Sequence, residues 1–220
     1  MREESMDKAQ DTSIDWRAAR ATQRRYDRQA PWFDLTDLPM ELVARALRRR
    51  LWARIDGGRV LEVGVGTGRN LSHHPAGSEV TAIDISPKLL AKAARKARKK
   101  GRPVELGLMD AQRLAFGDGS FDSAAATFVF CSVPDPLVGL AEVRRVLKPG
   151  GRFLLLEHVR SQNGVLGWLM DRLNPMFVRL SGANINRDTV GNVAKAGFEI
   201  VAVDSHMGGL VKLIDARKEA

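Results

Sequence analysis

The stretch from Arg59 to Asn70, R-V-L-E-V-G-V-G-T-G-R-N, decides how this chain of 220 residues folds. It begins with a short apolar run rich in β-branched residues, which is typical of a buried strand. Three alternating glycines follow, Gly64, Gly66 and Gly68, so the backbone either turns sharply there or comes very close to another group. The residues after Gly68 can begin a helix. A strand, a glycine turn and a helix form the entrance to a nucleotide-type site in an open α/β sheet.

The spacing of these glycines excludes two well-known phosphate sites. A dinucleotide-binding turn reads G-x-G-x-x-G, and here Arg69 stands where its last glycine belongs. A P-loop requires G-K-[ST] after its glycines, and no such string follows. A glycine turn alone is a weak indication, and a tight turn in some other α/β protein is the open alternative. The acid that precedes the loop, Glu62, makes the pattern more specific.

The composition predicts one globular domain with a preference for anionic partners. Apolar residues make up 44% of the chain, which is ordinary for a soluble protein, and 220 residues suffice for one core. A formal net charge of +9 favours nucleic acid or acidic lipid headgroups, although it could serve solubility alone. The single cysteine, Cys131, excludes an internal disulfide and suits a reducing compartment. We expect a cytoplasmic protein, since we find neither a secretory signal nor a run near the roughly 20 apolar residues that a spanning helix needs.

Residues 1–55 form a basic amphipathic segment ahead of the sheet. The first predicted helix runs from Ser13 to Arg28, before Pro31 interrupts the pattern. A second, from Met40 to Ile55, carries leucines and Trp52 on one face. Its other face carries four arginines: Arg45, Arg48, Arg49 and Arg50. Such helices either lie on an anionic membrane, here its inner face, or pack on the sheet with solvated arginines, and both alternatives stay open.

Downstream of the glycine loop, strands alternate with helices. Six more strands are predicted at Glu79–Ile85, Val104–Asp110, Phe121–Phe130, Arg152–His158, Phe198–Asp204 and Gly209–Ala216. One helix has Ser86 as its N-cap and Pro87 in its first turn and runs to about Lys100, and another ends at Pro149. This alternation predicts a doubly wound, seven-stranded α/β sheet in residues 56–220.

Four strings resemble the class I S-adenosylmethionine-dependent methyltransferases. They are E-x-G-x-G-x-G at Glu62–Gly68, Y-D-x-x-A-P-x-[YF]-D at Tyr26–Asp34, D-A-x-x-L-x-F at Asp110–Phe116 and E-V-x-R-V-L-K-P-G-G at Glu142–Gly151. The third departs slightly, with Ala115 in place of the family's usual proline. The resemblance covers Tyr26 to about Asp215 and is closest to the group of phosphatidylethanolamine N-methyltransferases and ubiquinone/menaquinone C-methyltransferases. It implies a Rossmann-like methyltransferase fold, mostly parallel with an antiparallel last strand.

The resemblance also implies which residues bind the cofactor, S-adenosylmethionine, and its product, S-adenosylhomocysteine. The expected set is Tyr26, Glu62, Gly64, Gly66, Gly68, Asp84, Ile85, Asp110, Ala111 and Thr127. The glycine loop would wrap the methionine and ribose portion. Asp84 would accept both ribose hydroxyls, because an ionised carboxylate takes two O–H donors at once. Asp110 would accept from the adenine amino group, the backbone of Ala111 would meet a ring nitrogen, and Tyr26 would cover the cofactor.

Methyl transfer needs alignment and, where the acceptor carries a proton, a base. The reaction is an in-line displacement at a carbon that a sulfonium already activates, so we expect no metal site; alignment can supply several kcal/mol. We expect His158 to be the base, because open α/β sheets place their chemistry at the carboxyl ends of strands. A histidine half-buried at a strand end is the alternative. Tyr26 could orient the acceptor through its hydroxyl group.

The acceptor side is predicted in an insertion at about 160–185, where family members shape the acceptor pocket. Its apolar stretch, Gly164 to Leu180, favours a lipid-like or small apolar acceptor or a membrane-facing lid, with core packing as the alternative. We expect the amine of phosphatidylethanolamine ahead of a quinone ring or a small thiol, and peripheral contact with an anionic membrane. A nucleic-acid acceptor is disfavoured, because Thr127 to Phe130 stand where base-modifying enzymes carry N-P-P-[YF]. A non-enzymatic binding module is the remaining rival, and no obligate protein partner is inferred.

Overall fold

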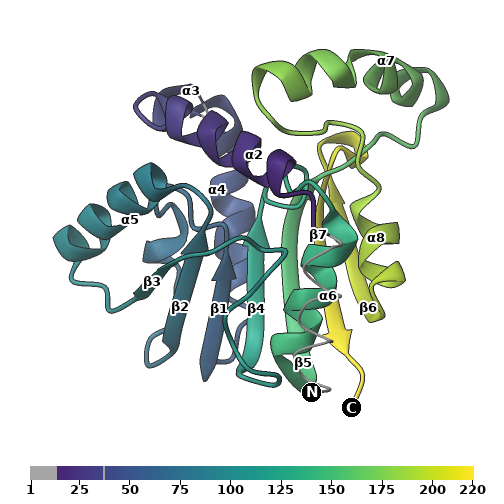
Figure 1. Ribbon diagram of the computed structural model, residues 1–220. Coiled ribbons are helices and arrows are strands. Elements are labelled where there is room, and N and C mark those ends of the chain that lie inside the picture. The colour runs from purple at the N-terminus through teal and green to yellow at the C-terminus, as the bar shows by residue number, and fades with distance from the viewer. Residues whose placement is uncertain (1–13, 37) are drawn as a thin grey trace, which may run out of the picture.

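A seven-stranded mixed sheet forms the centre of the computed structural model, which describes residues 14–36 and 38–220 (Figure 1). The strands are β1 Arg59–Val63, β2 Glu79–Asp84, β3 Glu105–Leu108, β4 Phe121–Thr127, β5 Leu147–His158, β6 Phe198–His206 and β7 Val211–Lys218. Their order is β3-β2-β1-β4-β5-β7-β6. Strands β1 to β5 pair in parallel, and only β7 runs antiparallel to its neighbours β5 and β6. The predicted fold class is confirmed.

Helices cover both faces of this sheet, because its central strands are apolar on both sides. The helices are α2 Trp16–Gln29, α3 Phe33–Thr36, α4 Leu38–Trp52, α5 Pro87–Lys100, α6 Pro136–Val146, α7 Gly164–Leu180 and α8 Thr189–Lys195. In β5, Phe153 and Leu155 pack with α6 and α8, whereas Leu154 and Leu156 pack with α4 on the other face. Helix α5 covers the same face as α4, through Ala93 against Ala82 of β2.

The glycine loop does not lead into an α-helix, so that part of the prediction is wrong. Only one 3-10 turn, η1 Asn70–Ser72, follows Gly68. Pro75 lies too close for a regular helix to form, because proline removes a backbone donor and clashes with the preceding turn. The side chain of Asn70 is also buried, where it serves the interior instead of a solvent-facing helix.

Other boundaries differ by a few residues from those predicted. Helix α6 ends at Val146, not at Pro149, because β5 already begins at Leu147. Strand β4 stops at Thr127, because Phe128 takes a left-handed conformation with φ of 59°. Helix α3 was not predicted, and the predicted helix start at Ser13 lies outside the described residues.

The inner face of α4 packs on the sheet, which settles part of the question about the N-terminal helices. Leu47, Leu51 and Trp52 are buried against β-strand residues. Arg48 was predicted on the solvated face, and this is wrong, since only 5% of the residue is exposed. Its guanidinium donates to the buried side chains of Asn70, after the glycine loop, and Thr127 of β4, which are distant in the sequence.

Helix α7 spans Gly164–Leu180, the segment predicted to be apolar, and stands largely outside the core. Of its 17 residues only Gly167 and Met170 are buried. The alternative that this segment is simple core packing is therefore wrong. Within the described ranges 14–36 and 38–220, no helix is both long enough and apolar enough to cross a bilayer.

Candidate active site

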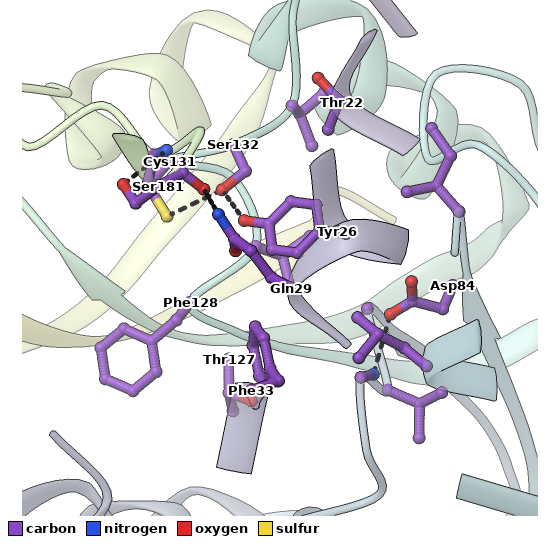
Figure 2. A pocket seen from close by; sticks show the side chains of 18 of the residues that line it. Thr22, Tyr26, Gln29, Phe33, Asp84, Thr127, Phe128, Cys131, Ser132 and Ser181 are labelled. Carbon is purple, nitrogen blue, oxygen red and sulfur yellow. Dashed lines mark hydrogen bonds between the residues drawn. The ribbon is translucent and has the colours of Figure 1, made fainter. Parts of the chain in front are cut away.

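A cavity of about 780 Å³ opens at the carboxyl ends of β1, β2, β4 and β5. Helix α2 lies over it, and the end of α7 borders it from the other side (Figures 1 and 2). Most of the predicted site residues line this one space: Tyr26, Gly64, Gly66, Asp84, Ile85, Asp110, Ala111, Thr127 and His158. Glu62 and Gly68 do not line it. The sheet topology thus brings residues from position 26 to position 158 to one site.

Two glycines of the loop have different structural reasons for lacking a side chain. Gly64 has φ of 71°, and a Cβ atom there would overlap the side chain of Val129, so its packing demands glycine. Gly66 has φ of 55°, but a Cβ there would meet nothing within 4 Å. Because this side of Gly66 is open, a ligand can approach its backbone closely.

Asp84 points its carboxylate to the edge of the cavity (Figure 2). One oxygen accepts from the backbone N–H of Gly66 at 2.8 Å and the other from that of Ser86 at 2.9 Å. Only 8% of the residue is exposed, and this burial raises the pKa of the carboxyl to about 6. Each oxygen keeps a free lone pair, so the group fits the role of acceptor for two hydroxyls.

The neighbouring edge of the cavity is suited to a flat heterocycle. Asp110, just after β3, accepts from the backbone N–H of Gln112 at 2.9 Å and from its side-chain amide at 3.1 and 3.2 Å. These bonds hold the carboxylate at the rim beside Ala111 and Ile85. An ordered acceptor next to a backbone segment and an apolar side chain can bind an amino-substituted ring on its edge and face.

Glu62 lies beneath the loop instead of in the cavity. It is fully buried and accepts from Asn70 Nδ2 at 2.7 Å and is bonded to His74 Nε2 at 2.7 Å. Asn70 Oδ1 in turn accepts from Arg48 at 3.1 Å, and Arg48 also donates to Thr127. In this position Glu62 fixes the glycine loop from below, and a direct contact with the cofactor stays a prediction.

Two members of this network, Arg48 and His74, escaped the sequence-based prediction. Arg48 lines the cavity from α4, with its charge paired to Glu41 at 3.1 Å and its guanidinium 5.4 Å from the ring of Phe128. The only local hint was that Glu41 lies seven residues before Arg48, two helical turns away on the same face. The contact with Thr127 joins residues 79 apart and depends on which strand lies under α4.

Tyr26 fastens α2 over the cavity. Its hydroxyl is bonded to Ser132 Oγ at 2.5 Å, and burial raises the pKa of the phenol above its ordinary value (Figure 2). Gln29, one turn further along α2, donates to the carbonyl of Leu180 at 3.1 Å. Ser132 and Leu180 lie far from α2 in the sequence, so α2 is tied to both walls of the cavity, and Tyr26 is placed to cover a bound ligand.

His158 and Glu157 end β5 and point to opposite faces, as successive strand residues must. His158 lines the cavity, and burial lowers the pKa of its imidazole below 6.5, which favours the neutral form that acts as a base. Glu157 is fully buried and accepts from the backbone N–H groups of Val129 at 2.8 Å and Phe130 at 3.0 Å. It holds the turn after β4 in place, a role that was not predicted.

The donor set fits a cationic nucleoside without a phosphate group. Asp84 and Asp110 supply carboxylates to the lining, and the open backbone at Gly66 lies beside Asp84, to which its N–H donates. Arg48 lines the same space with a guanidinium that pairs with Glu41 and bonds Asn70 and Thr127. A sulfonium nucleoside has the ribose hydroxyls and the amino-substituted ring that the two carboxylates complement.

Comparison with known proteins gives the same answer by an independent route. A family profile described as "Methyltransferase domain" matches residues 61–155. Phosphatidylethanolamine N-methyltransferase of Cereibacter sphaeroides is 39% identical over 150 residues, which cover 66% of this chain and 72% of that protein. Human thiol S-methyltransferase TMT1B is 34% identical over 171 residues, covering 71% and 69%. Demethylmenaquinone methyltransferase of Renibacterium salmoninarum is 30% identical over 219 residues, covering 88% and 90%.

Solved structures share the fold. An S-adenosylmethionine-dependent methyltransferase from Thermotoga maritima superposes with a TM-score of 0.68 at 23% identity, covering 90% of this chain and all of that one. The [4+2]-cyclase SpnF also reaches 0.68, at 24% identity, covering 80% and 81%. Because a cyclase shares the architecture, the fold alone does not define the reaction. The relatives in sequence do, and with the cavity they place this chain in the family of S-adenosylmethionine-dependent methyltransferases.

Proposed function

We propose that this enzyme methylates the headgroup amine of a lipid-like acceptor, with phosphatidylethanolamine as the first candidate. The observation that carries the proposal is the apolar part of the cavity lining. It is walled by aromatic and aliphatic side chains from four segments of the chain: Trp32, Phe33, Met40, Phe128, Phe177, Leu180 and Ile185. Such walls suit an acceptor with an apolar body and a small polar tip.

The proposed chemistry assigns each residue a simple task. S-adenosylmethionine supplies a methyl group activated on a sulfonium. The acceptor nitrogen must present its lone pair to that carbon, so it has to be neutral or lose a proton during attack. His158, which lines the cavity and is neutral at pH 7 because burial lowers its pKa, would take this proton. Tyr26, held by Ser132, would orient the polar tip and help to exclude water.

A quinone ring or a thiol is the second candidate acceptor. Both have an apolar body and a small reactive group, which the apolar part of the cavity lining also suits. The names of the relatives from human and from Renibacterium salmoninarum support the same two classes.

The acceptor can be identified with methyl-labelled S-adenosylmethionine and acceptors dispersed in the same detergent micelles. We would compare phosphatidylethanolamine, a demethylated menaquinone and an alkyl thiol. Phosphatidylcholine with the same acyl chains is the matched control, since its nitrogen has no site for a further methyl group. We expect label in phosphatidylethanolamine at least tenfold faster than in the other two. Faster labelling of the quinone or the thiol would overturn the first candidate.

A further inference from the structure

We propose that the face around the cavity mouth docks on an anionic lipid bilayer through two apolar contacts, one on α7 and the other made by Trp32, Leu35 and Leu42. Docking would let a lipid acceptor enter the cavity directly from the bilayer, and this part of the proposal rests on the proposed function. Docking itself stands on separate observations and is tested without any methyl transfer.

Helix α7 supplies the larger apolar contact. Its exposed apolar residues are Val165, Leu166, Trp168, Leu169, Leu173, Met176, Phe177 and Leu180. Trp168 is 59% exposed and Leu180 68%, values that a helix packed into a core would not show. A soluble domain rarely presents so continuous an apolar surface unless something covers it.

A second apolar patch lies across the cavity from α7. Trp32 and Leu35 are each 66% exposed, and Leu42 of α4 is 75% exposed. Trp32 lines the cavity from this side, whereas Phe177 and Leu180 line it from α7, so the two patches meet at one opening. Figure 1 shows α3 and α7 at the same end of the molecule, beyond the carboxyl edge of the sheet.

Helix α2 passes between these patches and carries the charge that selects the lipid (Figure 1). Four exposed arginines follow one another at intervals of three or four residues and so form one stripe: Arg17, Arg20, Arg24 and Arg28. Asp27, the one acid of this helix, is engaged by Ser86 at 2.6 Å. On α7, Arg172 lies 5.6 Å from the ring of Trp168. Interfacial helices bind acidic lipid by inserting apolar side chains into the bilayer interface while their arginines contact the lipid phosphates.

The same charges argue against a second copy of the chain as the occupant. In a two-fold symmetric dimer the same surface is present on both partners, so the arginine stripe of α2 would face arginines or lie buried without counter-charges. Like charges across an interface are unfavourable, whereas lipid phosphates neutralise them. A bilayer with acidic headgroups therefore fits this face better than a second copy of the chain does.

Flotation with vesicles of phosphatidylglycerol or of phosphatidylcholine tests the proposal. We expect wild-type protein to float with phosphatidylglycerol vesicles at least tenfold more tightly than with phosphatidylcholine, and less tightly as salt is raised. Trp168→Glu and Leu35→Glu should each weaken binding at least fivefold. The matched control is Val201→Glu, since Val201 is 52% exposed on β6, away from this face, and should bind like the wild type. Circular dichroism would verify that each variant folds.

Tryptophan fluorescence gives a second readout that needs no charge-introducing variant. Trp32 and Trp168 should shift to the blue with phosphatidylglycerol vesicles, and the double variant Trp32→Phe/Trp168→Phe should lose most of the shift while Trp16 and the buried Trp52 still emit. Docking would be overturned if the wild-type protein did not bind vesicles at low salt, or if Trp168→Glu and Leu35→Glu bound them as tightly as the wild type. Docking would also be overturned if the protein sedimented as a dimer, did not bind vesicles, and became a monomer on the change Trp168→Glu.

The outcomes also separate docking from the proposed acceptor. If the protein floats with vesicles but labels none of the lipids, docking is supported and the proposed acceptor is wrong. If it labels phosphatidylethanolamine in micelles but does not bind vesicles, the acceptor is supported and docking is wrong.

Discussion

Asp84 is held in a state that serves binding at some expense of stability. An ordinary aspartate has a pKa of 3.8, and burial raises that of Asp84 to about 6. The folded chain therefore binds this proton more tightly than the unfolded chain does. As pH rises from about 4 through about 6, the unfolded state loses its proton first, and the folded state loses stability relative to it. Two ribose hydroxyls donated to the ionised group would offset that loss.

The variant Asp84→Asn tests this balance. Without ligand, the free energy of unfolding of the variant minus that of the wild type should increase by about 1–3 kcal/mol from pH 4 to pH 7.5. The reason is that the wild-type carboxyl ionises over this range and the amide of the variant does not. Its affinity for S-adenosylhomocysteine should fall at least tenfold, since a neutral oxygen accepts less strongly. Urea unfolding at both pH values and calorimetry measure the two effects. A constant stability difference with pH would contradict the expected burial effect.

His158 should matter for the rate and not for the donor. His158→Ala is expected to lower kcat by about 10²-fold or more, the usual contribution of a general base, with unchanged affinity for S-adenosylhomocysteine. Because burial lowers its pKa below 6.5, the wild-type rate should be flat near pH 7 and fall only as pH drops through that lowered value. His206→Ala, at the end of β6 and outside the cavity, is the control. A variant with an unaltered pH–rate profile would exclude His158 as the base.

At the scale of the elements, patterns that repeat locally were predictable and contacts between distant elements were not. The presence of seven strands that alternate with helices followed from the apolar runs, and Ser86, the N-cap of α5, followed from its residue type and the proline after it. The whole extent of α7 was visible as an apolar stretch. By contrast, the ties from Glu62 to Asn70 and from Arg48 to Thr127 depend on how a loop and a helix settle on the sheet. No periodicity in the chain reports such contacts.

Arg48 tests how α4 supports the glycine loop. Arg48→Gln removes a buried charge that reaches Asn70 and Thr127, so the free energy of unfolding should fall by about 1–3 kcal/mol. The loop loses support at the same time, and donor affinity should fall with it. Arg49→Gln, on the exposed side of the same helix, should change stability by less than about 0.5 kcal/mol. Chemical unfolding of both variants checks this, and equal effects of the two changes would speak against a buried anchor.

Over the whole molecule, the polar and the apolar residues that line the cavity come largely from different parts of the chain. The matched methyltransferase region, residues 61–155, contains Gly64, Gly66, Asp84 and Asp110. The apolar wall residues come largely from outside that region, with Phe128 the one inside it and the others on both sides of it: Trp32, Phe33, Met40, Phe177, Leu180 and Ile185. The sequence accordingly pointed to the donor more firmly than to the acceptor, and the relatives carry different acceptors in their names.

Because α2 is tied to both walls of the cavity, donor binding should stabilise the molecule as a whole. S-adenosylhomocysteine at 100 times its Kd should add about 2.7 kcal/mol to the free energy of unfolding, or roughly 5–10 °C in Tm for a chain of this size. Trypsin should also cut the exposed arginines of α2 more slowly when the ligand is bound, because cleavage requires local opening of that helix. The variant Tyr26→Phe, which loses the bond to Ser132, should be cut faster at the start and keep less of the protection. Ligand-independent cleavage of α2, alongside a normal shift in Tm, would mean that the helix does not close over the donor.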